Sequence, residues 1–121
     1  MSHTMNIETE IRDTKALSSA CNRLNLDFDQ NIAPRKFYST TETGMAVNLD
    51  GWKYPVVIQE NGKLAYDNYN GSWGEDKELG KLKAYYGSEK AKIEARKKGY
   101  SVNETIDAVN GNLKLKICVG R

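Results

Sequence analysis

The fold is decided by the stretch from Glu75 to Val119, which reads EDKELGKLKAYYGSEKAKIEARKKGYSVNETIDAVNGNLKLKICV. Its first half predicts a long basic helix, because apolar side chains recur at helical spacing along one stripe. The stripe consists of Leu79, Leu82, Tyr86 and Ile93. We expect Asp76 to be the N-cap of this helix and Gly99 to end it in the left-handed conformation.

The second half of this stretch predicts a β-hairpin. Asn110-Gly111 is the preferred residue pair of a two-residue type I′ turn. Pairing outward from this turn places Glu104 opposite Ile117, on the face that otherwise carries apolar side chains. A strand residue that reaches water explains Glu104 more simply than a carboxylate with a perturbed pKa, because a buried charge needs a partner.

The N-terminal part of the chain predicts a strand followed by a helix. Residues 7–11 alternate between Ile or Thr and charged side chains, which is typical of a half-buried strand. A helix then begins at Asp13 or Thr14, either of which can cap it, and extends to about Asn25.

The middle of the chain predicts a long connection and then further strands. We expect residues 26–43 to be irregular, since they contain a proline and a run of Ser, Thr and Glu, with room for a short edge strand at 36–39. A strand at 45–49 follows. A second hairpin at 54–69 turns at Asn61-Gly62, which is again a type I′ pair.

The register set by Asn61-Gly62 leaves both faces of the second hairpin partly apolar. One face carries Val56, Ile58 and Ala65, and the other carries Val57, Gln59, Leu64 and Tyr66. A hairpin that is apolar on both faces predicts either a second small core or an exposed patch that seats a partner.

The order of these elements is strand, helix, three strands, helix, two strands. It predicts a single α+β domain over residues 1–121, a two-layer sandwich with both helices on one face of one mainly antiparallel sheet, as a ferredoxin-like variant. Opposite charges on the outer faces of the first and last strands favour these two strands as neighbours.

Composition limits the classes of function. The 121 residues carry a net charge of only +2, so no global field favours nucleic acid. No apolar run approaches the length of a membrane span, and the N-terminus lacks the pattern of a signal peptide. We therefore expect a cytoplasmic protein with no membrane partner.

Signals for catalysis or metal binding are weak. The single histidine, His3, and the absence of a Cys-x-x-Cys pair argue against a structural zinc site. Cys21 and Cys118 are isolated and suit packing roles. The carboxylates have no diagnostic spacing, and residues 70–74 lack the phosphate-binding glycine motifs. We expect no catalytic residue, no metal and no cofactor, which makes a small-molecule enzyme the least supported class.

Several segments carry a family resemblance. They are the start MSH, IETEIRD at 7–13 with Ala16-Leu17, ARKKGYSV at 95–102, and Glu104 followed by Asn110-Gly111. Together they resemble the uncharacterised family of cyanobacteria, algal plastids and some cyanophages known as hypothetical chloroplast reading frame thirty-five. The chain departs from the family pattern at Thr4 and in residues 26–43. The resemblance implies no catalytic residue, and it implies a cyanobacterial, plastid or phage setting.

Two regions are candidates for binding a partner. Aromatic residues and a lysine gather in sequence on or near the second hairpin: Trp52, Lys53, Tyr54, Tyr69 and Trp73. Our leading hypothesis is a non-enzymatic binding or accessory protein that uses them against an unknown protein partner or a second copy, as a homodimer. Simple packing against the core is the alternative explanation of these rings.

The basic helix is the second candidate. Residues 81–98 contain seven Lys or Arg and two Glu, a local excess of +5. The alternative function is therefore a nucleic-acid binder, less favoured, that uses this helix and the sheet aromatics. Its contact residues would be Lys90, Lys92, Arg96 and Lys97. A solvated outer face is the simpler explanation of these charges.

Overall fold

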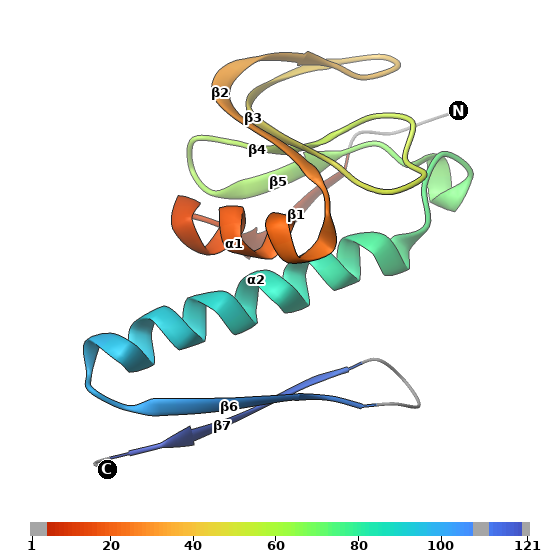
Figure 1. Cartoon of the computed structure of the whole chain (residues 1–121). Coiled ribbons are helices and arrows are strands. Elements are labelled where there is room, and N and C mark those ends of the chain that lie inside the picture. Colours follow the sequence, from red (N-terminus) through yellow and green to blue (C-terminus); the bar gives the residue numbers. More distant parts are fainter. Residues whose placement is uncertain (1–4, 108–111, 120–121) are drawn as a thin grey trace.

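A computed structural model of the chain describes residues 5–107 and 112–119. The elements are β1 (Met5–Glu10), α1 (Thr14–Leu24), β2 (Asp27–Lys36), β3 (Thr41–Asn48), β4 (Val56–Ile58), β5 (Lys63–Tyr66), the 3-10 helix η1 (Tyr69–Gly71), α2 (Asp76–Lys97), β6 (Ser101–Ile106) and β7 (Leu113–Cys118). This is an α+β sandwich, as predicted, with both described α-helices on one face of the larger sheet (Figure 1).

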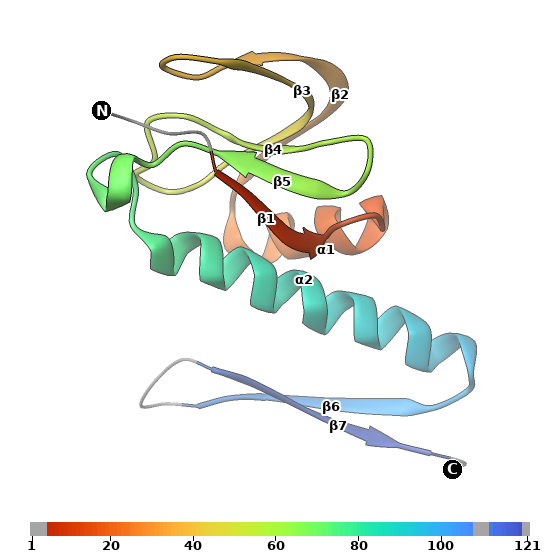
Figure 2. The same ribbon diagram turned by 180° about the vertical axis from the view of Figure 1, so that it is seen from behind.

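The described strands form two antiparallel sheets rather than one. The larger sheet has the order β1-β5-β4-β3-β2, and β6 pairs with β7 in a separate sheet. The small sheet lies on the side of α2 that faces away from the larger sheet (Figures 1 and 2). The first and last strands are therefore not neighbours, and the ferredoxin-like order is not confirmed. The helices fill the space between the sheets.

Helix α1 begins and ends as its sequence predicts. Asp13 is the N-cap, and its Oδ1 accepts a hydrogen bond from the Ala16 amide at 3.1 Å. Asn25 takes the left-handed conformation at the C-terminus, with φ of 56°. The apolar face of α1 is buried in the core between the helices and the larger sheet.

Helix α2 is covered on two sides. Leu79, Leu82 and Tyr86 pack into the core against the larger sheet, while Ser88 is buried and donates its hydroxyl to Glu104 of β6. The N-cap is Glu75 rather than the predicted Asp76. The Asp76 carboxylate is engaged elsewhere in the chain, as described below. Gly99 follows the helix with φ of +77°, as predicted.

Residues 26–43 are not irregular, which corrects the sequence prediction. They form most of a hairpin between β2 and β3, in which Pro34 lies opposite Thr43. Pro34 is tolerated because β2 is the edge strand of the sheet and a missing N–H there disturbs no second neighbour. Most residues of β2 are exposed, so the strand lacks the alternation of apolar and polar residues that would have revealed it.

The second hairpin is shifted by one residue from the predicted register. Gly62 alone adopts a positive φ, +84°, and its amide donates to the Gln59 carbonyl at 2.8 Å. The turn is therefore a three-residue loop with a left-handed glycine instead of a type I′ turn. As a result Ile58 lies opposite Leu64 and Val57 lies opposite Ala65.

A one-residue shift exchanges the faces of a strand pair. Leu64 now shares the helix-facing core with Val56 and Ile58, whereas Ala65 joins Val57 on the outer face. There Val57 and Ala65 pack with Phe37, and Tyr54 lies against them. The second small core is thus confirmed, but Leu64 and Tyr66 lie in the main core instead, and Ala65 lies beside Val57.

The last hairpin is shifted by two residues, which preserves its faces. Ile106 lies opposite Leu113, and Glu104 lies opposite Leu115 rather than Ile117. The Asp107 amide donates to the Asn112 carbonyl at 2.9 Å, which continues the pairing of the two strands by one residue on each side. The predicted turn residues Asn110-Gly111 lie outside the described part of the chain.

Candidate functional site

Aromatic side chains gather at one end of the larger sheet, where three connections meet. These are the β2–β3 turn, the β3–β4 connection and the segment from β5 to α2, all at the same end in Figure 1. The Lys53 amide donates to the Trp73 carbonyl at 2.8 Å and joins two of these connections. We call the group Tyr38, Lys53, Tyr54, Tyr69 and Trp73 the aromatic surface.

Trp73 is the centre of the aromatic surface. The Tyr69 ring stacks on it, with centroids 4.8 Å apart and planes 29° from parallel. Tyr54 meets it edge to face at 5.6 Å and 71°, and Tyr38 is tilted against it at 5.5 Å and 45°. Such pairs contribute about 0.5–1.5 kcal/mol each beyond their buried area. The rings therefore hold one another in place at the surface.

A single lysine of this surface lies over two of its rings. Lys53 Nζ is 4.5 Å from the centroid of Trp73 and 5.5 Å from that of Tyr54. Both distances fall within the range of cation–π attraction. The ammonium group is thereby held beside the aromatic rings and gives this surface a local positive charge.

The polar tips of three of these rings remain available. Within the described part of the chain, the Trp73 indole N–H and the hydroxyls of Tyr38 and Tyr54 have no hydrogen-bond partner, and none of them is sealed from solvent. Tyr38 is 65% exposed. Buried Tyr and Trp groups normally find hydrogen-bond partners, so these donors suit a surface that awaits an acceptor.

The backbone that carries Tyr69 is strained. Tyr69 and Asn70 both adopt left-handed conformations, with φ of 47° and 53°. A bulky residue in this region is an outlier that costs on the order of 1–3 kcal/mol and persists only where its surroundings impose it. Such outliers cluster at functional sites, and here the conformation places Tyr69 against Trp73.

Polar side chains also hold the segment from β5 to α2 in place. Asn68 Nδ2 donates to the Gly74 carbonyl at 3.1 Å and to Asp76 Oδ1 at 2.6 Å. Asp67 is fully buried, and its Oδ2 has no hydrogen-bond partner among the described residues. A buried acceptor without a partner lowers the free energy of unfolding, so this segment keeps its particular shape at a cost in stability.

The structure brings together four of the five predicted partner-binding residues. Trp52 is the exception: its ring packs into the main core against Tyr66, with centroids 5.7 Å apart, and its Nε1 donates to the Glu75 carbonyl at 3.0 Å. Trp52 thus supports the site from inside. Tyr38 was missed because its segment was expected to be irregular, although the adjacent aromatic pair Phe37-Tyr38 was a usable signal.

The predicted nucleic-acid residues of α2 are largely neutralised by carboxylates. Lys90 Nζ lies 3.1 Å from Asp13 Oδ2, and Lys97 Nζ lies 3.5 Å from Glu94 Oε2. The hydrogen bond to Asp13 raises the pKa of Lys90. Lys92 is paired as well, in the cluster described next. Arg96 is exposed in the last turn of the helix.

Glu104 is the centre of a charged cluster that joins β6 to both helices. Its Oε2 accepts from Arg23 of α1 at 2.6 Å, and its Oε1 lies 2.9 Å from Lys92 of α2 and accepts from the Ser88 hydroxyl. The Arg23 hydrogen bond is the main cause that lowers the pKa of Glu104 to about 2. The Glu104 side chain is only 14% exposed. Both of its oxygens are occupied, so the cluster has a structural role.

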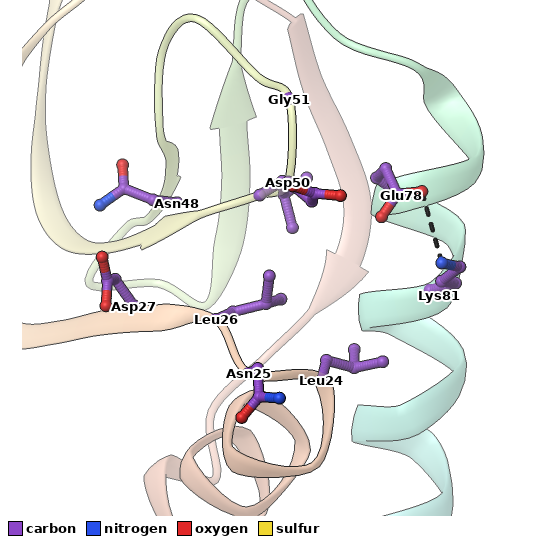
Figure 3. A pocket seen from close by; sticks show the side chains of 10 residues that line it. Leu24, Asn25, Leu26, Asp27, Asn48, Asp50, Gly51, Glu78 and Lys81 are labelled. Carbon is purple, nitrogen blue, oxygen red and sulfur yellow. Dashed lines mark ion pairs between the residues drawn. The ribbon is translucent and has the colours of Figure 1, made fainter.

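An open cleft of about 530 Å³ lies on another part of the molecule. It is bordered by the C-terminus of α1, the ends of β2 and β3, and the first turns of α2 (Figure 3). Asp27, Asp50 and Glu78 line it, and Glu78 pairs with Lys81 at 3.4 Å. Within the described ranges no group of three or more His, Cys, Asp or Glu side chains could hold a metal ion. The cleft offers polar lining without an arranged catalytic pair.

Comparisons with known proteins add no family. No protein-family model matches the chain, no curated protein matches it, and no solved structure matches it. The family resemblance of the sequence therefore stays a prediction. None of the described helices is both long and apolar enough to cross a membrane.

Proposed function

We propose that this chain is a non-enzymatic binding or accessory protein that holds a protein partner on the aromatic surface. The observation that carries the proposal is the convergence of three tyrosine rings on Trp73 at the surface, outside the main core. Trp and Tyr are the residues most enriched at the energetic centres of protein interfaces. The free thiols of Cys21 and Cys118 fit a reducing compartment such as the cytoplasm.

The strain and the open donors support the same proposal. A left-handed tyrosine and a buried carboxylate oxygen without a partner, Asp67 Oδ2, both lower the stability of the chain beside these rings. An aromatic ring with a free N–H or O–H can bury its apolar body against a partner and satisfy its polar tip there. Packing alone would not require donors that face water.

Protein is favoured over nucleic acid as the partner because of the charges. The lysines that would contact phosphates, Lys90, Lys92 and Lys97, each lie within 3.5 Å of a carboxylate. Nucleic acid would have to break these pairs before it could use the charges. The aromatic surface itself contains one cation, Lys53.

Photo-crosslinking in an extract of the native host tests the proposal. The photoreactive residue p-benzoylphenylalanine replaces Tyr38, and in a matched control it replaces Ile32, which is 68% exposed in β2. Protein adducts are expected from position 38 and not from position 32, because only position 38 lies beside Trp73. Adding Trp73→Ala to the first variant should abolish the adducts.

Three results would contradict the proposal. Equal adducts from both positions would indicate non-specific contact. Adducts that persist after Trp73→Ala would show that binding at position 38 does not depend on the aromatic surface. Adducts made of nucleic acid at position 38 would support the alternative function instead.

A further inference from the structure

The chemistry of the aromatic surface narrows the class of partner, if the proposed function holds. The surface offers flat apolar rings together with hydrogen-bond donors, namely the Trp73 indole N–H and the hydroxyls of Tyr38 and Tyr54. A complementary ligand presents apolar rings and carbonyl acceptors. A polyproline II segment does so, because its backbone makes no internal hydrogen bonds and proline adds a ring without adding a donor.

The spacing of the rings fits such a segment. The centroids of Tyr38 and Tyr54 lie 5.5 and 5.6 Å from that of Trp73. Two residues of polyproline II advance by about 6 Å and lie on two adjacent edges of this three-sided helix, so prolines at i and i+2 can rest against neighbouring rings. The ligand arrives with little conformational entropy to lose, which suits a surface of this small size.

The charge at the site adds a second requirement. Lys53 Nζ is held over Trp73 and Tyr54, where it would repel a basic ligand and attract a carboxylate. We infer that the aromatic surface binds a proline-rich segment in the polyproline II conformation, flanked by acidic residues. The inference rests on the proposed function and commits it to one ligand chemistry.

Nuclear magnetic resonance can test this inference with an internal reference. The chain has two tryptophans, so its ¹H–¹⁵N spectrum holds two indole signals. The Trp52 indole donates to the Glu75 carbonyl at 3.0 Å, whereas the Trp73 indole has no hydrogen-bond partner among the described residues. The probe is a peptide of eight prolines followed by two glutamates. It should shift the Trp73 signal saturably and leave the Trp52 signal in place.

Matched variants and control ligands define the contact. Tyr38→Ala, at an exposed site that should not disturb folding, is expected to weaken binding about tenfold or more, as at an interface centre. Lys53→Glu should weaken binding of the acidic probe more than Lys98→Glu, an exposed charge at the end of α2. A peptide that replaces the prolines with Gly-Ser repeats, at equal charge, should not shift Trp73.

The inference and the proposed function fail in different ways. If the proline probe leaves Trp73 unmoved while protein adducts still form at position 38, the ligand class is wrong and the binding function stands. A Trp73 shift with oligothymidine but not with the proline probe, or a shift on raising the protein concentration alone, would replace the proline-rich ligand by nucleic acid or by a second copy.

Discussion

Replacing Glu104 with glutamine tests how the small sheet is held to the helices. Hydrogen bonds from Arg23, Ser88 and Lys92 lower the pKa of Glu104 from its ordinary value of 4.5 to about 2. The lowering of about 2.5 pH units corresponds to about 3 kcal/mol of folding free energy, at about 1.4 kcal/mol for each unit. The side chain is only 14% exposed, so solvent screens these interactions little.

The lowered pKa makes the stabilisation by Glu104 depend on pH. The unfolded chain binds a proton at Glu104 from about pH 4.5 downward, whereas the folded chain resists protonation until about pH 2. The stabilisation is therefore fully present above pH 5 and disappears as the pH falls through about 2. Glu104→Gln should lower the free energy of unfolding by about 3 kcal/mol at pH 7. The difference from the unchanged protein should shrink steadily between pH 5 and pH 2.

Urea unfolding followed by circular dichroism across this pH range provides the measurement. Glu60→Gln is the matched control, because Glu60 is exposed in the β4–β5 turn and no ion pair joins it to the described residues. Its difference from the unchanged protein should stay near zero throughout. A Glu104→Gln difference that is equally large at pH 7 and pH 3 would refute the electrostatic explanation. It would point to lost packing instead.

Three further substitutions test the support of the aromatic surface. Gly74→Ala should destabilise the fold by about 1–3 kcal/mol in thermal unfolding, because an added Cβ would overlap the Trp52 ring. Gly80→Ala, in the second turn of α2 where nothing lies near an added Cβ, should instead stabilise the fold by about 1 kcal/mol, and a loss there would mean that the added methyl group meets a neighbour. Asp67→Asn should change the free energy of unfolding by less than about 1 kcal/mol in urea, because Oδ1 can still accept from the Tyr69 amide and the replaced atom, Oδ2, has no partner to lose. A loss of several kcal/mol would mean that Oδ2 is engaged.

The helices could be predicted because their signals are local. Asp13 as a cap and Gly99 as a terminator act within a few residues, and the structure confirms both. The sheet required information that a single sequence lacks. Asn61-Gly62 is compatible with two kinds of turn, and the choice between them decides which face Leu64 occupies.

The candidate site was predictable in composition but not in arrangement. Tyr54, Tyr69 and Trp73 stood out as aromatic residues near one hairpin, and they do meet. Trp52 had the same signal but faces the core. Tyr38 reaches the site only because β2 and β3 pair. β2 is a mostly exposed edge strand, and its sequence has no clear period that would predict this pairing.

The connection between β5 and α2 has a dynamic consequence. The same few residues carry the Trp73 ring and end in the N-cap Glu75, whose carbonyl accepts from both the Trp52 indole and the Glu78 amide. Fraying of the first turn of α2 and loosening of Trp73 therefore belong to one local opening equilibrium. A ligand on the aromatic surface should slow hydrogen exchange at the Glu78 amide and leave the Lys98 amide, at the far end of the helix, unchanged. Binding of a ligand to the aromatic surface would thus be measurable as slower hydrogen exchange in a helix that the ligand does not contact.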